Sequence, residues 1–97
     1  DGATRTIRKA LDLALDYDRS PLAQRSPLEE VHVEASGDMT LVCGKSGVVL
    51  RMGGAPYKRK LDQAVRIVGE LDRRGAKPDT IMLDDEARPD RVVVRMR

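Results

Sequence analysis

Several residue groups in this 97-residue sequence have types and spacings that could do chemistry, and the first is Gly44-Lys45-Ser46. A phosphate-binding loop ends in this order, so that backbone N–H groups and the dipole of a following helix face the phosphate. That loop also needs a glycine five residues before Gly44, where this sequence has Met39, and the residues after Ser46 predict a strand. We therefore interpret the segment as a hairpin turn.

The second group is the carboxylate run Asp84-Asp85-Glu86. Carboxylate oxygens are the ligands that hard cations prefer, but such ions need about six to eight ligands. No further ligand is spaced around the run, so the sequence predicts a solvated acidic turn and no metal site.

His32 and the single cysteine, Cys43, are of types that serve as base and nucleophile. The alternation of their segments places His32 on the polar face of one strand and Cys43 on the apolar face of another. A single cysteine also excludes an internal disulfide and does not fit a zinc site. We predict no catalytic residue, metal ligand or cofactor, and hence no enzyme.

The most informative segment is residues 91–97, Arg-Val-Val-Val-Arg-Met-Arg. It predicts a strand in which Val92, Val94 and Met96 share one face, while Val93 and the arginines share the other. A valine-rich strand at the end of a small domain is expected at a sheet edge. An unpaired edge is either protected by charge or used to bind another chain, and the sequence leaves both possibilities open.

A basic patch accompanies this strand and is the charge cluster with functional weight. It consists of Arg88, Arg91, Arg95 and Arg97. A solvated edge that resists aggregation and a protein-docking surface explain it equally well. In the docking interpretation, the residues that contact a partner are Arg88, Arg91, Val92, Val93, Val94 and Arg95.

Composition limits the classes of protein that fit. The hydrophobic fraction of 40% suffices for a core, while 18 basic and 16 acidic residues leave a net charge of only +2. The sequence has no Phe, no Trp and two Tyr, which argues against single-stranded nucleic acid binding by base stacking. No apolar run approaches the roughly 18 residues of a membrane span.

Two amphipathic helices are predicted from the apolar spacing. The first covers residues 4–17, and the two prolines in the polar loop 18–27 follow it. The second covers residues 57–74, with Pro56 near its first turn and Gly75 after its last. The apolar stripe that the first helix is predicted to carry consists of Ile7, Ala10, Leu11, Ala14 and Leu15.

Five short segments predict strands, which lie at residues 30–34, 39–43, 48–52, 80–83 and 91–97. In the first, Val31 and Val33 are both predicted to point inward. The order α-β-β-β-α-β-β indicates one α+β domain over residues 1–97, with an antiparallel or mixed sheet of about five strands and two helices on one face.

Three segments, 53–61, 65–71 and 89–95, together resemble the C-terminal extracytoplasmic domain of the FtsQ/DivIB family of bacterial cell-division proteins. In that family a strand ending in glycine precedes a helix with Lys-Leu near its start, here Lys60-Leu61. A closing strand of pattern P-(D/N)-x-V-x-V completes the sheet. The first helix, the proline loop and the strand around Val31 follow the family's order, so the resemblance covers nearly the whole chain. A difference is Asp84, which stands where members often carry a basic residue.

The resemblance implies a non-enzymatic scaffold of the divisome that supports septum formation and binds no small-molecule substrate and no nucleic acid. Its implied partners are FtsB (DivIC) and FtsL, with a partner strand added along residues 91–95. The parent would be a single-pass inner-membrane protein with a transmembrane helix and a POTRA domain upstream of this extracytoplasmic domain. Because the sequence begins at Asp1 without an initiator Met, we expect a fragment of such a longer protein. A proline at Val93 is expected to remove a donor needed for pairing.

The alternative hypothesis is a small basic α+β domain that binds RNA. Its motivation is the isoelectric point near 8.9, and it would use the same arginines on phosphates. It predicts binding that weakens steeply with salt.

Overall fold

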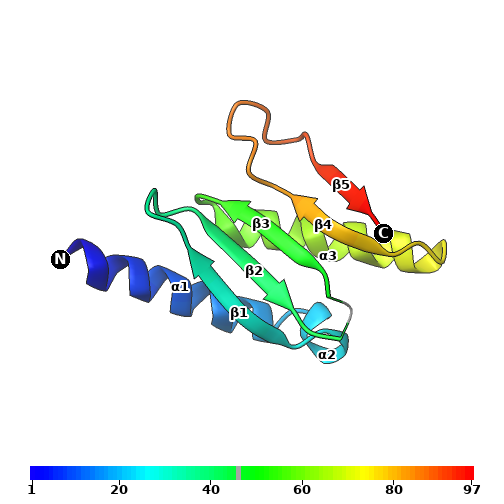
Figure 1. Cartoon of the computed structure of the whole chain (residues 1–97), viewed down its shortest axis with the longest axis horizontal. Coiled ribbons are helices and arrows are strands. Elements are labelled where there is room, and N and C mark those ends of the chain that lie inside the picture. The colour runs from blue at the N-terminus through cyan, green and yellow to red at the C-terminus, as the bar shows by residue number, and fades with distance from the viewer. Residues whose placement is uncertain (46) are drawn as a thin grey trace.

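Figure 1 shows two long helices behind one face of a five-stranded sheet in this computed structural model, which describes residues 1–45 and 47–97. The α+β class and the order of the main elements are as the sequence predicts. One short helix is additional and occupies part of the predicted proline loop. The elements are α1 (Gly2–Asp18), α2 (Leu22–Arg25), β1 (Leu28–Val33), β2 (Met39–Cys43), β3 (Val49–Gly53), α3 (Tyr57–Arg73), β4 (Pro78–Met82) and β5 (Val93–Met96).

The strands lie in the order β1-β2-β3-β4-β5. Neighbouring strands are antiparallel, except that β3 and β4 are parallel because α3 carries the chain back between them. Leu50 on β3 lies opposite Leu41 on β2 and opposite Ile81 on β4. The sheet is therefore mixed, and its two edges are β1 and β5.

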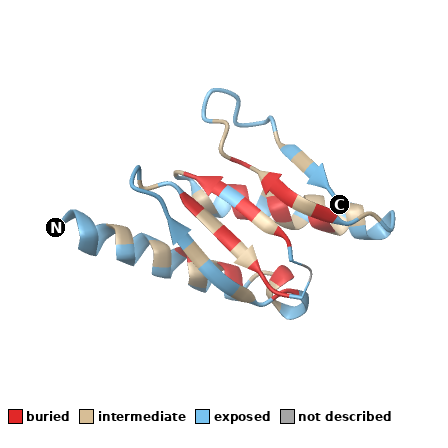
Figure 2. Ribbon diagram, viewed as in Figure 1, coloured by how far each residue is buried: buried red, intermediate tan, exposed pale blue. Residues whose placement is uncertain are grey.

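The core lies between the sheet and the helices, where one face of each central strand is buried (Figure 2). On β2 the predicted alternation is observed, since Met39, Leu41 and Cys43 are buried. Leu50 and Ile81 continue the same inner layer on β3 and β4. Burying a side chain of this size stabilises the fold by about 1.5–3 kcal/mol.

The stripe predicted for the first helix is wrong for its three largest side chains. Ile7, Leu11 and Leu15 are 61%, 59% and 52% exposed, whereas Leu13 and Tyr17 are buried. The helix carries a second apolar stripe at i, i+3, i+4, i+7 spacing, and this stripe is the one that faces the sheet. The hydroxyl of Tyr17 also donates to the carbonyl oxygen of Ser26, which fixes this rotation of the helix. The stripe in use consists of the buried Leu13 and Tyr17 and the half-buried Ala10 and Ala14.

The two edge strands differ from prediction at their ends. β1 begins at residue 28 and β5 at residue 93, because pairing with β2 and β4 decides where each ladder starts. Val33 lies opposite Met39 on the inner face but is 41% exposed, since no strand lies beyond β1 in the described part of the chain. Met96 is 44% exposed and does not join the core with its predicted companions. Edge position therefore overrides the alternation at both places.

A buried lysine joins β3, α3 and the loop before β5. Lys60 is 4% exposed, and its Nζ donates to the carbonyl oxygens of Met52 at 2.8 Å and Gly54 at 2.6 Å. A carboxylate oxygen of Glu86 lies 3.6 Å from the same Nζ, and it also accepts from the N–H of Gly54 at 3.3 Å. Lys60 thus satisfies backbone carbonyls at the end of β3 where the chain turns into α3.

Candidate partner-binding site

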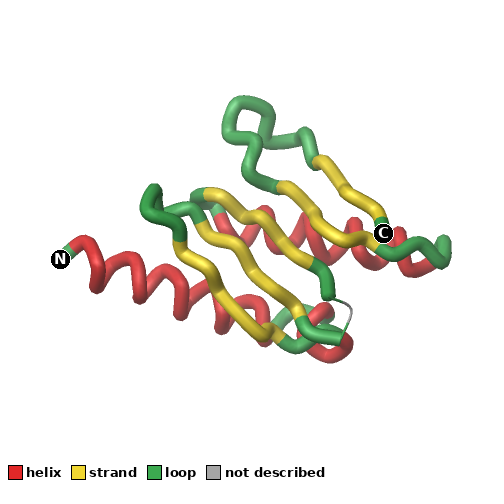
Figure 3. Tube along the Cα trace, viewed as in Figure 1, coloured by secondary structure: helices red, strands yellow, loops and turns green. Residues whose placement is uncertain are grey.

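β5 forms one edge of the sheet (Figure 3). It pairs with β4, with Val93 opposite Met82 and Arg95 opposite Thr80. Among residues 1–45 and 47–97, no strand lies on its other side. The expected edge position of the closing valine strand is therefore observed, although the strand is shorter than predicted.

The direction of the backbone amides in β5 follows from one hydrogen bond. The N–H of Arg97 donates to the carbonyl oxygen of Lys77 over 3.2 Å, so this amide points toward the β4 side. Successive peptide groups of a strand point to opposite sides, which directs the amide of Val93 toward β4 and those of Val94 and Met96 outward. The outer side of β5 thus presents donors and acceptors of the kind that pair with an added strand.

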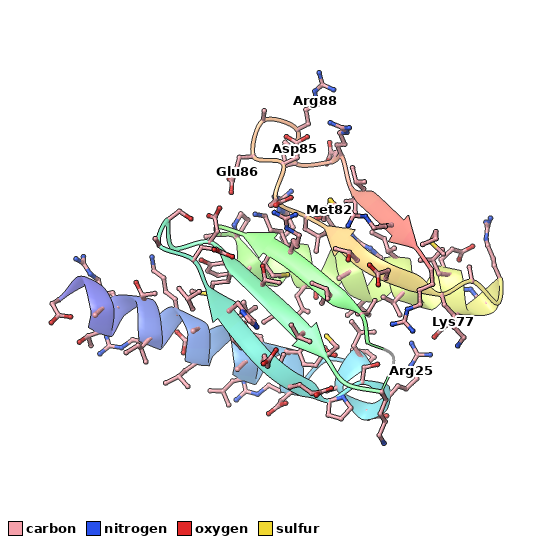
Figure 4. The ribbon with its side chains drawn as sticks, in the orientation of Figure 1. Arg25, Lys77, Met82, Asp85, Glu86 and Arg88 are labelled. Atoms are coloured by element: carbon pink, nitrogen blue, oxygen red, sulfur yellow. The ribbon has the colours of Figure 1, made fainter. Side chains whose placement is uncertain are left out.

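The side chains of β5 alternate as the sequence predicts near its start. Val92 and Val94 are half-buried and pack against the core, whereas Val93 is 40% exposed on the outer face. Across the ladder, Val93 neighbours the half-buried Met82, which Figure 4 labels. Arg95 is exposed beside them. The inner valines hold the strand in place and the outer face offers an apolar pair next to a cation.

The predicted basic patch is spread along the edge and does not form one cluster. Arg88 extends from the tip of the β4–β5 loop (Figure 4). Arg97 follows the last residue of β5, at the opposite end of that strand. Arg91 lies between them, with Nη1 3.4 Å from a carboxylate oxygen of Asp85. The same carboxylate accepts from the backbone N–H of Arg88 at 3.1 Å. Asp85 therefore orders the loop and offsets part of its positive charge.

Outside the loop, the acidic run contacts cations from two elements, β3 and α3. Oδ2 of Asp84 lies 3.6 Å from Nε of Arg51 on β3, and Glu86 lies near Lys60 on α3. Within the described residues, no group of three His, Cys, Asp or Glu side chains is arranged to hold a metal ion. Arg51 places a guanidinium beside Asp84, the position at which the family resemblance led us to expect a basic residue.

The Gly44-Lys45-Ser46 segment lies between two strands. Gly44 and Lys45 form a turn after β2, and the N–H of Gly44 donates to the carbonyl oxygen of Pro27 at 2.7 Å. β3 follows at residue 49, so the helix that a phosphate-binding loop requires is replaced by a strand. Ser46 lies outside the described residues, and its part of the hairpin interpretation stays a prediction.

His32 and Cys43 lie on opposite faces of the sheet. His32 is exposed, with Nε2 3.1 Å from a carboxylate oxygen of Glu30. Cys43 is buried against Tyr17. Burial raises the pKa of the Cys43 thiol, and the hydrogen bond with Tyr17 opposes part of this rise. Burial also raises the pKa of the Tyr17 hydroxyl. Because the sheet separates them, His32 and Cys43 cannot act together as base and nucleophile.

These raised pKa values predict a loss of stability in alkaline solution. The folded state keeps the protons of Cys43 and Tyr17 where the unfolded state releases them, so the free energy of unfolding should fall as pH rises above about 8.5. Urea midpoints between about pH 7 and pH 10 measure this fall. Cys43→Ala should reduce the slope, and an equally steep slope in that variant would contradict the assignment to Cys43.

Comparison with known proteins places the chain in a family. No family model and no solved structure matches it. It is 36% identical to the cell division protein FtsQ of Myxococcus fulvus, in a match that covers 97% of this chain and 32% of the relative. It is 32% identical to the cell division protein FtsQ of an Anaeromyxobacter species, in a match that covers 90% of this chain and 29% of the relative. FtsQ of Geotalea daltonii is 26% identical over 97% of this chain and 33% of the relative. The chain spans about a third of the length of these curated relatives. The likeness to all three over nearly all of its residues confirms the resemblance, and the chain belongs to the FtsQ family of cell division proteins.

Proposed function

We propose that this domain is a non-enzymatic scaffold that binds FtsB/DivIC-like and FtsL-like division proteins by accepting a partner strand along β5. The observation that carries the proposal is the outward direction of the Val94 and Met96 amides on an edge without a neighbouring strand in the described residues. Backbone pairing supplies affinity, and alternate side chains supply specificity. The contact residues are the set expected from the sequence, Arg88, Arg91, Val92, Val93, Val94 and Arg95, with Met96 added.

Charge supports an acidic partner strand. β5 carries Arg95, and Arg91 precedes it in the loop, whereas the opposite edge strand β1 carries Glu29 and Glu30, with Glu34 just after it. Like charges directly opposite each other destabilise a strand pair, which disfavours pairing of two β5 edges. A strand with Glu or Asp on its outer face would gain from the same arginines.

The parent protein would place this domain outside the inner membrane. In this proposal the longer protein is single-pass, with a transmembrane helix and a POTRA domain before the domain described above. The relatives support the view that more chain belongs to the protein, since this sequence matches about a third of their length. Within residues 1–45 and 47–97, no helix is long and apolar enough to cross a membrane.

The RNA-binding alternative gains no support. The relatives bear the name of a cell division protein, and the arginines that would contact phosphates are spread along an edge instead of forming a patch. Arg91 is also paired with Asp85. A phosphate-binding surface would need a continuous basic face.

Met96→Pro tests the strand-addition proposal. The Met96 amide points outward, and its side chain is 44% exposed. Its neighbour on β4 is Pro78, and because proline has no N–H, no hydrogen bond from that residue is lost in the variant. The variant should fold normally but bind the ectodomain of the FtsB-like protein at least about tenfold more weakly by calorimetry, because one pairing donor is replaced by a ring.

Met96→Ala is the matched control, since it removes the side chain and keeps the N–H. It should bind nearly as well as the wild type. Val93→Pro is a poorer test than the sequence indicated, because its amide points toward β4 and its loss would damage the domain's own ladder. Unchanged affinity of a Met96→Pro variant with normal circular dichroism would overturn the proposal.

A further inference from the structure

A cavity of about 350 Å³ lies at the end of the sheet where β4 begins and β5 ends. This volume is within the range of small ligand pockets. No residue of the β4–β5 loop lines it, and Figure 4 shows Arg25 and Lys77 at this end of the sheet while Arg88 lies at the other. The apolar part of its lining consists of Tyr17, Leu22, Val48, Val68 and Pro78.

The polar part of the lining is strongly cationic. Arg25 forms an ion pair with Asp72, so these two charges offset each other. Three further cations, Lys45, Lys77 and Arg97, line the same cavity. Across the described residues, neither Lys45 nor Lys77 forms an ion pair of its own, which leaves an excess of positive charge around an apolar floor.

The cations are brought together by three separate segments of the chain. Arg97 is fixed by the bond from its backbone N–H to the carbonyl oxygen of Lys77, at 3.2 Å. Its guanidinium lies over Gly47, where an added β-carbon would be 2.6 Å from Nη2. Lys45 comes from the same turn, with a left-handed φ of 62°. The arrangement depends on the fold and not on sequence proximity.

We propose that this cavity binds an acidic peptide segment, with an apolar side chain of the peptide in the cavity and a neighbouring carboxylate held by Lys45, Lys77 and Arg97. The apolar floor favours a hydrocarbon group, and the cations form charge-assisted hydrogen bonds with a carboxylate. A hydrated phosphate would use only the cations and leave the floor empty. The site requires no pairing with β5 and goes beyond the strand-addition surface.

A short peptide of defined sequence tests the proposal. Acetyl-Leu-Glu-Leu-amide, added to the ¹⁵N-labelled domain, should produce saturable shifts in the amide resonances of Gly47, Lys77 and Arg97. The double variant Lys45→Glu/Lys77→Glu should bind the peptide at least about tenfold more weakly, because charge-assisted bonds are lost. Lys58→Glu, an exposed charge reversal on α3 that does not line the cavity, should leave the affinity unchanged.

Two further ligands decide the chemistry of the site. The same peptide with Gln in place of Glu should bind at least about tenfold more weakly if the carboxylate is recognised. Inorganic phosphate should compete poorly, since it cannot fill the apolar floor. Equal binding of the Gln peptide, equal competition by phosphate, or the absence of saturable shifts in the folded wild-type domain would each overturn the proposal. Loss of partner binding in Met96→Pro has no bearing on these outcomes.

Discussion

Lys60→Met is expected to lower the free energy of unfolding by about 3 kcal/mol. The Nζ of Lys60 donates to two backbone carbonyl oxygens, of Met52 and Gly54, and lies near Glu86. Methionine fills a similar volume without a donor, so the buried carbonyl of Met52 loses its bond to Nζ and the carboxylate loses its nearby cation. Domains of this size have unfolding free energies of roughly 5–15 kcal/mol, so the loss is a large fraction of the total.

Urea unfolding followed by circular dichroism measures this effect, with the midpoint and slope fitted together. Lys58→Met is the matched control, because Lys58 lies on the same helix with an exposed side chain. The control should change stability by less than about 0.5 kcal/mol. If both variants shift the midpoint equally, Lys60 does not stabilise the junction of β3 and α3.

Gly53→Ala is expected to cost a similar amount, about 3 kcal/mol, for a different reason. Gly53 ends β3 with a φ of +66°, a left-handed conformation that side chains disfavour by roughly 1–2 kcal/mol. A β-carbon there would lie 2.8 Å from Cβ and 3.1 Å from Cα of Asp84. The contact with Asp84 Cα cannot be relieved by rotating a side chain, so the backbone that leads into the β4–β5 loop would have to move.

Gly75→Ala separates the two contributions. Gly75 has a φ of +71°, but an added β-carbon meets no atom within 4 Å. This control should therefore show the conformational cost alone, roughly 1 kcal/mol. Thermal or urea unfolding of both variants gives the difference, and equal losses would show that the close approach of Gly53 to Asp84 is relieved without cost.

The sequence predicted the central strands better than the first helix. The alternation in β2 has a single solution, because shifting it by one residue would bury Thr40 and expose Leu41. In α1 two apolar stripes compete, and the periodicity alone does not distinguish them. The bonded and buried Tyr17 decides between them, which only the three-dimensional arrangement reveals.

The candidate site was predictable in position but not in detail. Valine alternation indicated the edge strand and its inner residues. The direction of each amide in β5 depends on the register with β4, which the sequence does not give. The sequence therefore did not indicate that Met96, with its outward amide, tests strand addition better than Val93. Buried Lys60 was also missed as a structural residue, because lysine is rarely fully buried. The signal in the sequence that could have indicated its structural role was its place in the Lys-Leu pair of the family pattern.

The parallel pairing of β3 with β4 has a consequence for the order of folding. The hairpins of β1, β2 and β3 join residues close in sequence, whereas Val49 pairs with Thr80 only after the intervening α3 has been placed. Contacts between distant residues form more slowly because the connecting chain must first be ordered. We therefore expect the meander to form early and β4 and β5 to dock late. The surface that would receive a partner strand would then exist only in molecules that have completed folding, so that partner capture would also select for properly folded copies.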